Sequence, residues 1–298
     1  MEHRRPRRYS RRIGRHSTFH RFGIVGYGHF GEFLARSLAG RRRDVIVTDV
    51  ARDRLPSGTG RLRAGSFAEV AGCDVVLLAV PAAALTSTLD DLRPLLQPDT
   101  VVMDVVSTKT RATALLPEVL TDHPNLLATH PLFGPPSMRR MQRGQRLVVT
   151  FVAGERARAF LDWLHARYGL EILDVDADDH DRAMAYMQAL PFFIARALVS
   201  LQVDHLPHVP NREQLSLPSF EQLERIAAIE HLHTDDMFET CQQSNPYAQM
   251  AREQLIDALT RLHAELAEGR VSGEVAPADP SDLQADAPVE PPPVPASD

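Results

Sequence analysis

Apolar residues gather in short runs between residues 22 and 176, and polar or glycine-rich turns separate the runs. The first of them lies in RFGIVGYGHFGEFLARSL at residues 21–38, where an apolar run meets a glycine turn and apolar positions then recur at helical spacing. This pattern predicts a strand, a tight turn and a helix. Further runs follow at residues 44–50, 74–81, 100–106, 125–131, 145–151 and 170–176.

These later runs are rich in branched residues and do not alternate with polar ones, which is typical of parallel strands that are covered on both faces. Helical stretches at 82–93, 109–120 and 155–168 separate most of them. We therefore predict a doubly wound α/β domain over residues 21–176. From residue 177 to about 268 the strand pattern stops, and the apolar spacing predicts an all-helical domain whose helices pack on each other or across a dimer.

The two ends of the chain have a different composition from the middle. Residues 1–20 are rich in arginine, and 269–298 are rich in proline, alanine and acids. We expect both ends to be disordered, because such compositions bury little apolar surface. For the basic arm three interpretations stay open: a flexible arm that touches something acidic, an organelle-targeting peptide, or an upstream start without structural meaning.

Charge and cysteine content narrow the class of protein. The chain has 298 residues, 44% of them hydrophobic, and a net charge of -6. The stretch between the two ends is acidic, which argues against nucleic-acid binding, and no segment suggests a membrane span or a secretory signal. Two isolated residues, Cys73 and Cys241, form neither a disulfide framework nor a zinc site. We expect a cytoplasmic protein without a metal.

The glycine turn has the spacing G-x-G-x-x-G at Gly26, Gly28 and Gly31. Because it follows a strand and opens a helix, it predicts a dinucleotide site in a Rossmann-type domain. Asp49 ends the second strand, where an acid accepts hydrogen bonds from the ribose hydroxyls and favours NAD, while Arg52 and Arg54 keep NADP open. The predicted cofactor contacts are Gly26, Tyr27, Gly28, His29, Phe30, Gly31, Asp49, Val80 and Pro81.

Reactive side chains follow two later strands, and in such folds ligands bind beyond the carboxyl ends of the strands. Ser107 and Lys109 follow the run at 100–106, and His130 lies at the end of the run at 125–131. Lys109 is the only lysine of the chain, which suggests a position where a compact ammonium fits and a guanidinium does not. His130 is the expected base, since imidazole accepts a proton near neutral pH. We predict that all three face the nicotinamide half of the cleft.

Three segments together resemble the prephenate and arogenate dehydrogenases, the cyclohexadienyl dehydrogenases of tyrosine biosynthesis. VVMDVVSTKT is similar to the family's D-V-x-S-x-K, THPLFGPPS to H-P-M-F-G-P, and HDRAMAYMQALPFF to H-D-x-x-x-A. The resemblance covers residues 21–265. It implies an oxidative decarboxylation in which NAD+ takes hydride, His130 accepts the hydroxyl proton and CO2 leaves. It also implies that Ser107 bonds the same hydroxyl or orients His130, and that Lys109 fixes its loop or meets a carboxylate.

The helical region departs from the family pattern, and this leaves the substrate open. The family's S-H-L-P-H reads Gln188-Ala189-Leu190-Pro191-Phe192 here, so Gln188 is a candidate substrate contact. The family's carboxylate-binding arginine matches Arg225 in one alignment. When the alignment is counted back from the following segment, it matches Ile229, and His231 is then the candidate substitute. His180 is the fourth predicted substrate contact. Prephenate and arogenate are balanced, and 4-amino-4-deoxyprephenate is an alternative. A homodimer through the helical domain is expected.

Two other classes of protein compete with this interpretation. One is a catalytically silent NAD-binding regulator, suggested by the altered helical motif. The other is a dehydrogenase of the β-hydroxyacid type, which also joins a Rossmann domain to helices and uses a lysine. Detectable turnover separates the first, and a substrate panel separates the second.

Overall fold

A computed structural model of the chain describes residues 19–51, 53, 55–58, 60–135, 139–205 and 217–269. The side chains of 202–205 are outside this description. Most of the predicted basic arm, Arg52, Arg54 and the predicted tail from residue 270 onward also lie outside the described residues.

Eight strands form one sheet in the order β3-β2-β1-β4-β5-β6-β7-β8. Six of them, β1 to β6, are parallel, whereas β7 pairs antiparallel with β6 and β8 runs parallel to β7. The predicted doubly wound sheet is thus confirmed, with a reversed pair of strands at one edge and an unpredicted short strand, β3, at the other. The strands are β1 (Arg21–Val25), β2 (Asp44–Thr48), β3 (Leu62–Ala64), β4 (Val75–Leu78), β5 (Val101–Asp104), β6 (Leu126–Pro131), β7 (Arg146–Ala153) and β8 (Glu171–Asp174).

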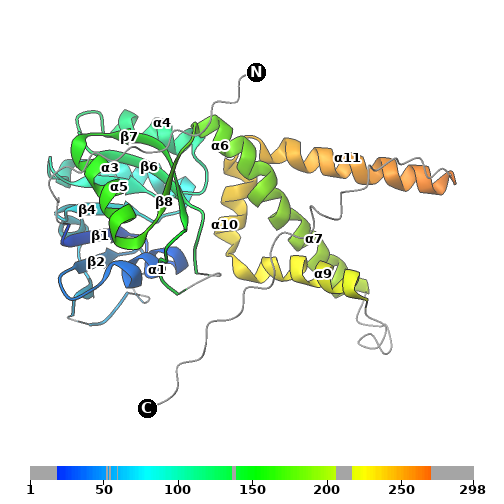
Figure 1. The fold of residues 1–298 in the computed structure, drawn as a ribbon, viewed down its shortest axis with the longest axis horizontal. Coiled ribbons are helices and arrows are strands. Elements are labelled where there is room, and N and C mark those ends of the chain that lie inside the picture. The colour runs from blue at the N-terminus through cyan, green and yellow to red at the C-terminus, as the bar shows by residue number, and fades with distance from the viewer. Residues whose placement is uncertain are drawn as a thin grey trace, which may run out of the picture. The chain divides into compact units, whose positions relative to one another are not determined.

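Helices cover both faces of this sheet (Figure 1), which explains why its central strands are apolar on both sides. Side chains of α1 and α5 join one buried core, and side chains of α2, α3 and α4 join the other. Local residues set several helix ends: Ser66 and Glu69 form a capping box at the start of α2, and Gly169 ends α5 with a φ of 67°. The helices are α1 (His29–Leu38), α2 (Phe67–Ala71), α3 (Leu85–Leu92), α4 (Thr110–Val119) and α5 (Glu155–Tyr168), with short 3-10 turns η2 (Ala82–Ala84) and η3 (Arg93–Leu95).

The strand order changes direction at β1, whose neighbours are β2 on one side and β4 on the other. In an open α/β sheet this switch point leaves a crevice at the carboxyl ends of the strands, where ligands bind. The glycine turn follows β1 and the segment Ala79-Val80-Pro81 follows β4, so the fold places both at this crevice.

The chain after β8 is helical in its described part, as predicted. Two π-helical turns, η4 and η6, interrupt it, and the Gln242 amide of η6 donates to the Ala189 carbonyl of η4 at 2.6 Å. Such turns release backbone groups and are frequent at functional sites. The elements are α6 (Ala177–Met184), η4 (Ala185–Ala189), α7 (Leu190–His205), α9 (Pro218–Ala227), η5 (Ala228–Leu232), α10 (Asp235–Glu239), η6 (Thr240–Ser244) and α11 (Ala248–Ala267).

Two features of these helices concern apolar surface. By length and composition alone, Ala177–Leu201 is apolar enough to cross a membrane, although a helix that packs in a water-soluble protein passes the same test. Residues 253–269 belong to a second compact unit, within which α11 exposes Ile256, Leu259, Leu262 and Leu266. Their spacing places these four side chains on one face of the helix.

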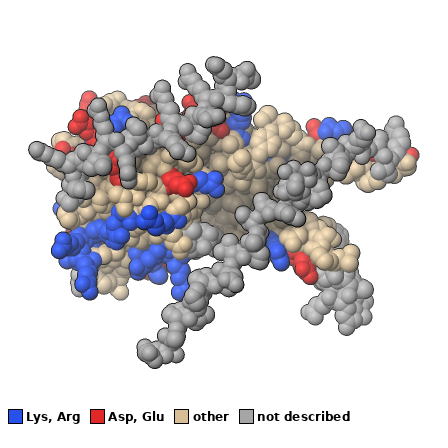
Figure 2. Space-filling model, viewed as in Figure 1, with Lys and Arg blue, Asp and Glu red and all other residues tan. Residues whose placement is uncertain are grey.

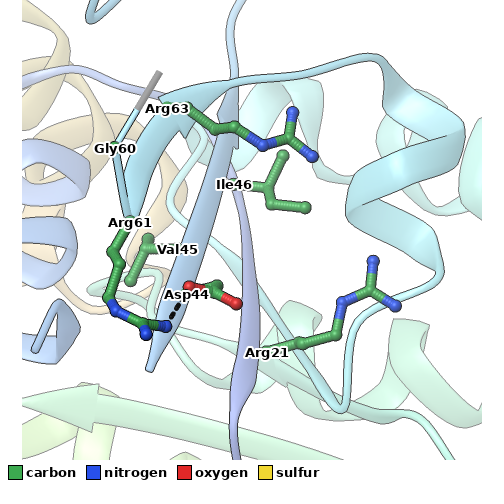
Figure 3. A pocket seen from close by; sticks show the side chains of 7 residues that line it. All are labelled: Arg21, Asp44, Val45, Ile46, Gly60, Arg61 and Arg63. Atoms are coloured by element: carbon green, nitrogen blue, oxygen red, sulfur yellow. Dashed lines mark hydrogen bonds and ion pairs between the residues drawn. The ribbon is translucent and has the colours of Figure 1, made fainter. Parts of the chain in front are cut away.

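A pocket of about 220 Å³, shown in Figure 3, is lined by residues at the amino ends of β1 and β2, and so lies at the opposite end of these strands from the crevice. It is lined by first residues of β1 and β2, Arg21 and Asp44, and by arginines next to and within β3, and Arg61 pairs with Asp44 at 2.7 Å. Figure 2 shows basic side chains gathered over this part of the sheet domain. The pocket lies at the amino ends of the strands, so it is separate from the predicted reaction site.

Candidate active site

The glycine turn after β1 has the shape that a dinucleotide needs. Gly26 has a φ of 95°, and a Cβ there would lie 2.3 Å from the Ala79 carbonyl oxygen. A Cβ on Gly31 would lie 2.0 Å from the Gly26 oxygen, whereas nothing lies within 4 Å of a Cβ on Gly28. The first and third glycines therefore permit the turn and the close helix packing, and the second leaves open space in front of the backbone. These residues fit a bound pyrophosphate.

Helix α1 points its amino end at this open space. It begins at His29, and its N-cap residue, Gly28, makes no side-chain cap, which suits an anion at free N–H groups. Asp49 lies beside the turn, because its Oδ2 accepts from the Tyr27 amide at 2.5 Å and its Oδ1 from the Ala51 amide at 2.8 Å. Its carboxylate is thus held at the end of β2.

The other predicted cofactor contacts lie around the same crevice. His29 is exposed in the first turn of α1, and half-buried Phe30 stacks on Phe33 with ring centroids 5.7 Å apart. Val80 and Pro81 follow β4, where Pro81 precedes the short turn η2.

His130 lies near the carboxyl end of β6, and Ser107 lies just beyond the carboxyl end of β5. Both are buried, with 5% and 6% of their surface exposed. The pairing of β6 with β7 shifts register between Ala128 and Thr129, immediately before His130. Such a bulge bends the strand and re-aims the side chains that follow it. Ser107 donates its hydroxyl to the Met237 sulfur of α10 at 3.3 Å, so it contacts the helical region rather than His130.

Lys109 lies at the N-cap of α4, and its side chain is completely buried. Its ammonium donates to the Asp104 carboxylate and to the Thr129 carbonyl, at 2.7 Å for the latter. Asp104 is equally buried and also accepts from the amides of Val106 and Thr129. The roles expected for Lys109 were to fix its loop or to meet a carboxylate. In the structure its ammonium meets the carboxylate of Asp104, which belongs to the chain itself, and this contact holds the loop. The expectation of a cation open to the cleft is corrected, since the ammonium is enclosed at the end of β5.

His180, predicted as a substrate contact, is buried and hydrogen-bonded to His130. Its Nε2 is 2.9 Å from His130 Nδ1, and its Nδ1 is 2.9 Å from Asp181 Oδ1. Asp181 also accepts from the backbone amides of Lys109 at 2.7 Å and Thr110 at 2.8 Å. Helix α6 thereby links the imidazole of His130 to the start of α4.

Burial lowers the pKa of His130 well below its usual value, and the neighbouring His180 imidazole and Lys109 ammonium lower it further, while Asp181 opposes the shift. His130 is therefore neutral near pH 7 and able to accept a proton. Burial raises the pKa of Asp181, but hydrogen bonds from His180 and from the amides of Thr110 and Lys109 outweigh it and lower that pKa overall. Asp181 is an ionised carboxylate beside a neutral base.

The remaining predicted substrate contacts lie elsewhere in the helical region. Gln188 is half-buried in the π-helical turn η4, while Arg225 is exposed in the last turn of α9 and His231 is exposed in η5. The described hydrogen-bond network of His130 includes none of these three.

Three residues at the site were absent from the predicted set: Asp104, Asp181 and Met237. Both aspartates had a visible sequence signal, because each stands inside a segment that supported the family resemblance and Asp104 interrupts an apolar run. Buried acids need partners, so an acid in an apolar strand calls for a nearby cation. Met237 carries no such signal.

Comparison with known proteins gives two matching family descriptions. "Prephenate dehydrogenase, nucleotide-binding domain" matches residues 34–149, and "Prephenate dehydrogenase, dimerization domain" matches residues 176–274.

Curated relatives and solved structures agree with these matches. Arogenate dehydrogenase 1 of Arabidopsis thaliana is 31% identical over 63% of this chain, but the match spans only 31% of its own length. The 4-amino-4-deoxyprephenate dehydrogenase of Streptomyces pristinaespiralis is 30% identical over 83% of this chain and 84% of its own. A crystal structure of prephenate dehydrogenase from A. aeolicus, with hydroxyphenyl propionate and NAD+, has the same fold. Its TM-score is 0.69 at 19% identity, covering 86% of this chain and 93% of that one.

Proposed function

This chain belongs to the prephenate dehydrogenase family, and we propose that it catalyses the NAD-dependent oxidative decarboxylation of prephenate or arogenate. The products are 4-hydroxyphenylpyruvate and tyrosine, respectively. The observation that carries the proposal is the buried, neutral His130 at the carboxyl end of β6, in the same sheet whose switch point holds the glycine turn.

Each part of the site has a role in this reaction. NAD+, when bound, supplies the acceptor for the hydride. The glycine turn and the first turn of α1 would hold its pyrophosphate, and Asp49 would accept hydrogen bonds from the ribose hydroxyls. In this proposal His130 takes the proton of the substrate hydroxyl, and Ser107 exchanges its bond to Met237 for a bond to the same hydroxyl. Lys109 holds β5 and β6 together through Asp104 and the Thr129 carbonyl.

The carboxylate of Asp49 supports NAD over NADP. It stands after β2, where one oxygen accepts from the Tyr27 amide of the glycine turn and the other from the Ala51 amide, so a 2′-phosphate would meet a negative charge there. The three helical-region residues Gln188, Arg225 and His231 are proposed to complete the substrate site.

The proposed domain organisation follows from the same features. Residues 21–176 form the cofactor domain, and residues 177–268 form the helical domain for substrate binding and dimerisation. Exposed apolar side chains support a homodimer, among them Met187 at 73%, Leu217 at 64% and Leu232 at 52%. We place the protein in the cytoplasm, consistent with its two buried free thiols.

A second substrate, 4-amino-4-deoxyprephenate, has its own support. The Streptomyces relative that acts on it by name is matched over 84% of its own length, whereas the Arabidopsis relative is matched over 31% of its own. Oxidation of a ring amine also needs a base that accepts a proton, so His130 would serve either substrate.

These proposals are tested by assaying the three substrates with NAD+ and with NADP+. The initial rate is measured from the absorbance of the reduced cofactor. We expect turnover with NAD+ and one preferred substrate. His130→Asn is the matched control, and it should lower kcat by about 10²- to 10⁴-fold while NAD+ still binds. If purified wild-type protein binds NAD+ but converts none of the three substrates, the proposed activity is wrong and the catalytically silent NAD-binding regulator is favoured.

A further inference from the structure

His130 is tied to the helical region by two hydrogen bonds in series. Its Nδ1 meets His180 Nε2, and His180 Nδ1 meets Asp181 Oδ1, at 2.9 Å in both cases. The two rings stand nearly perpendicular, at 82°, with centroids 5.1 Å apart. All three residues are buried, at 5%, 2% and 0% exposed, so water does not compete for these bonds.

The chemistry of Asp181 sets the direction of the chain. Its carboxylate is ionised and can only accept, and two backbone amides already donate to it. His180 Nδ1 therefore carries the proton of its bond to Asp181. In a neutral His180 the Nε2 then has a lone pair, so the proton of the next bond belongs to His130 Nδ1. This leaves His130 Nε2 as the unprotonated nitrogen.

We propose that Asp181 and His180 are positioning residues that hold His130 in the Nδ1–H tautomer, so that its Nε2 faces the reaction as the base. This inference rests on the proposed function and adds to it the second and third members of the catalytic chain. A carboxylate that orients a histidine in this way has a precedent in hydrolytic triads, where a wrong tautomer costs about 10⁴-fold in kcat. Here an additional imidazole stands between the acid and the base.

The proton and electron movements balance with this tautomer. The substrate hydroxyl gives its proton to His130 Nε2 while the ring carbon gives hydride to the nicotinamide. The C–C bond to the leaving carboxylate then breaks, its electron pair enters the ring, and CO2 departs. The proton on Nε2 returns to the same oxygen as the ring becomes a phenol. During the step His130 is positively charged, and the carboxylate of Asp181 stabilises that charge through His180.

The charges around His130 agree with this division of roles. The ammonium of Lys109 is engaged by Asp104 and the Thr129 carbonyl, so it supplies no proton to the imidazole. Burial and the Lys109 ammonium keep His130 neutral before the reaction, while Asp181 favours the protonated form. The resting enzyme is thus an available base, and the carboxylate limits the cost of charging it.

Two substitutions of His180 form a matched pair. In His180→Gln, the amide oxygen can accept from His130 Nδ1 and the amide nitrogen can donate to Asp181, which keeps the direction of the chain. In His180→Phe, a ring of similar size fills the space without either bond. We expect single-turnover hydride transfer to fall about 10²-fold in His180→Phe and less than about 10-fold in His180→Gln, with NAD+ affinity unchanged in both.

The tautomer is measured directly by ¹⁵N NMR of the full-length protein labelled in histidine, with His130→Asn assigning the signals. We expect Nδ1–H and a bare Nε2 in wild type and His180→Gln, and loss of this fixed form in His180→Phe. An Nε2–H signal for His130 in wild type, or equal rates in the two variants, overturns the inference. The NMR measurement needs no substrate, so it tests the tautomer even if the substrate panel shows no turnover. If the wild-type protein shows turnover but His130 has the other tautomer, the inference about Asp181 and His180 is wrong while the proposed function holds.

Discussion

The ammonium of Lys109 is enclosed, and the shape of this site accounts for a lysine at this position in a chain whose other basic side chains are arginine. We therefore predict that arginine does not fit here. In Lys109→Arg a wide guanidinium with five N–H donors enters a site that offers one Asp104 oxygen and the Thr129 carbonyl. The lysine side chain is among the largest that are fully buried, so the added atoms overpack the end of β5. Overpacking costs about 1–3 kcal/mol and each unpaired buried donor about 1–3 kcal/mol.

Counting the overpacking and a single unpaired donor, the expected loss in free energy of unfolding for Lys109→Arg is about 2–6 kcal/mol, a large part of the ~5–15 kcal/mol that holds a domain folded. Lys109→Met tests the charge rather than the size. It leaves Asp104 buried without its cation, at a cost of about 3–5 kcal/mol. The reverse exchange on the surface, Arg36→Lys, is the matched control. Arg36 is 62% exposed in its pair with Glu32, so a change within about 0.5 kcal/mol is expected.

Urea unfolding followed by circular dichroism measures the three variants beside wild type. The order expected for stability is wild type and Arg36→Lys together, with both Lys109 variants well below. A Lys109→Arg protein as stable as Arg36→Lys would refute the reasoning, because the site would then accept a guanidinium and the single lysine would be an accident of composition.

Three further predictions concern the cofactor turn, cofactor choice and pH. Gly26→Ala should destabilise the fold, because its Cβ would lie 2.3 Å from the Ala79 oxygen, whereas Gly28→Ala should fold normally and lose NAD+ affinity. Thermal melts with and without NAD+ separate the two variants. Equal melting temperatures of the two variants without NAD+ would contradict the prediction. Asp49→Ser should raise kcat/KM for NADP+ relative to NAD+ by 10-fold or more, on the order of 1.4 kcal/mol, and an unchanged ratio would remove Asp49 from cofactor choice. The folded pKa of His130 lies below its unfolded value, so its contribution to stability is full above about pH 6.5 and is lost as pH falls, by up to about 1.4 kcal/mol per pH unit. His130→Gln should show a shallower decline of unfolding free energy between pH 7 and 5, and parallel curves would count against it.

Local patterns carried most of the fold. The strand, glycine turn and helix at residues 21–38 were predictable because hydrophobic spacing and the steric freedom of Gly26 act within a few residues of each other. The same holds for the later strands of the sheet. The reversed direction of β7 was not predictable in this way, since an apolar run has the same composition whichever way it pairs. Strand β3 is only three residues long and leaves no periodic pattern.

The candidate site divides along the same line. The sequence alone determined that Ser107, Lys109 and His130 stand at the ends of strands, because strand ends are set by neighbouring residues. Only the tertiary structure decided which groups they meet. His180 reaches His130 across 50 positions, Met237 reaches Ser107 across 130, and the role of Lys109 depends on a burial that no local pattern encodes. Hydrogen bonds act over about 3 Å in space and are indifferent to distance along the chain, so they follow from the fold and not from the motif.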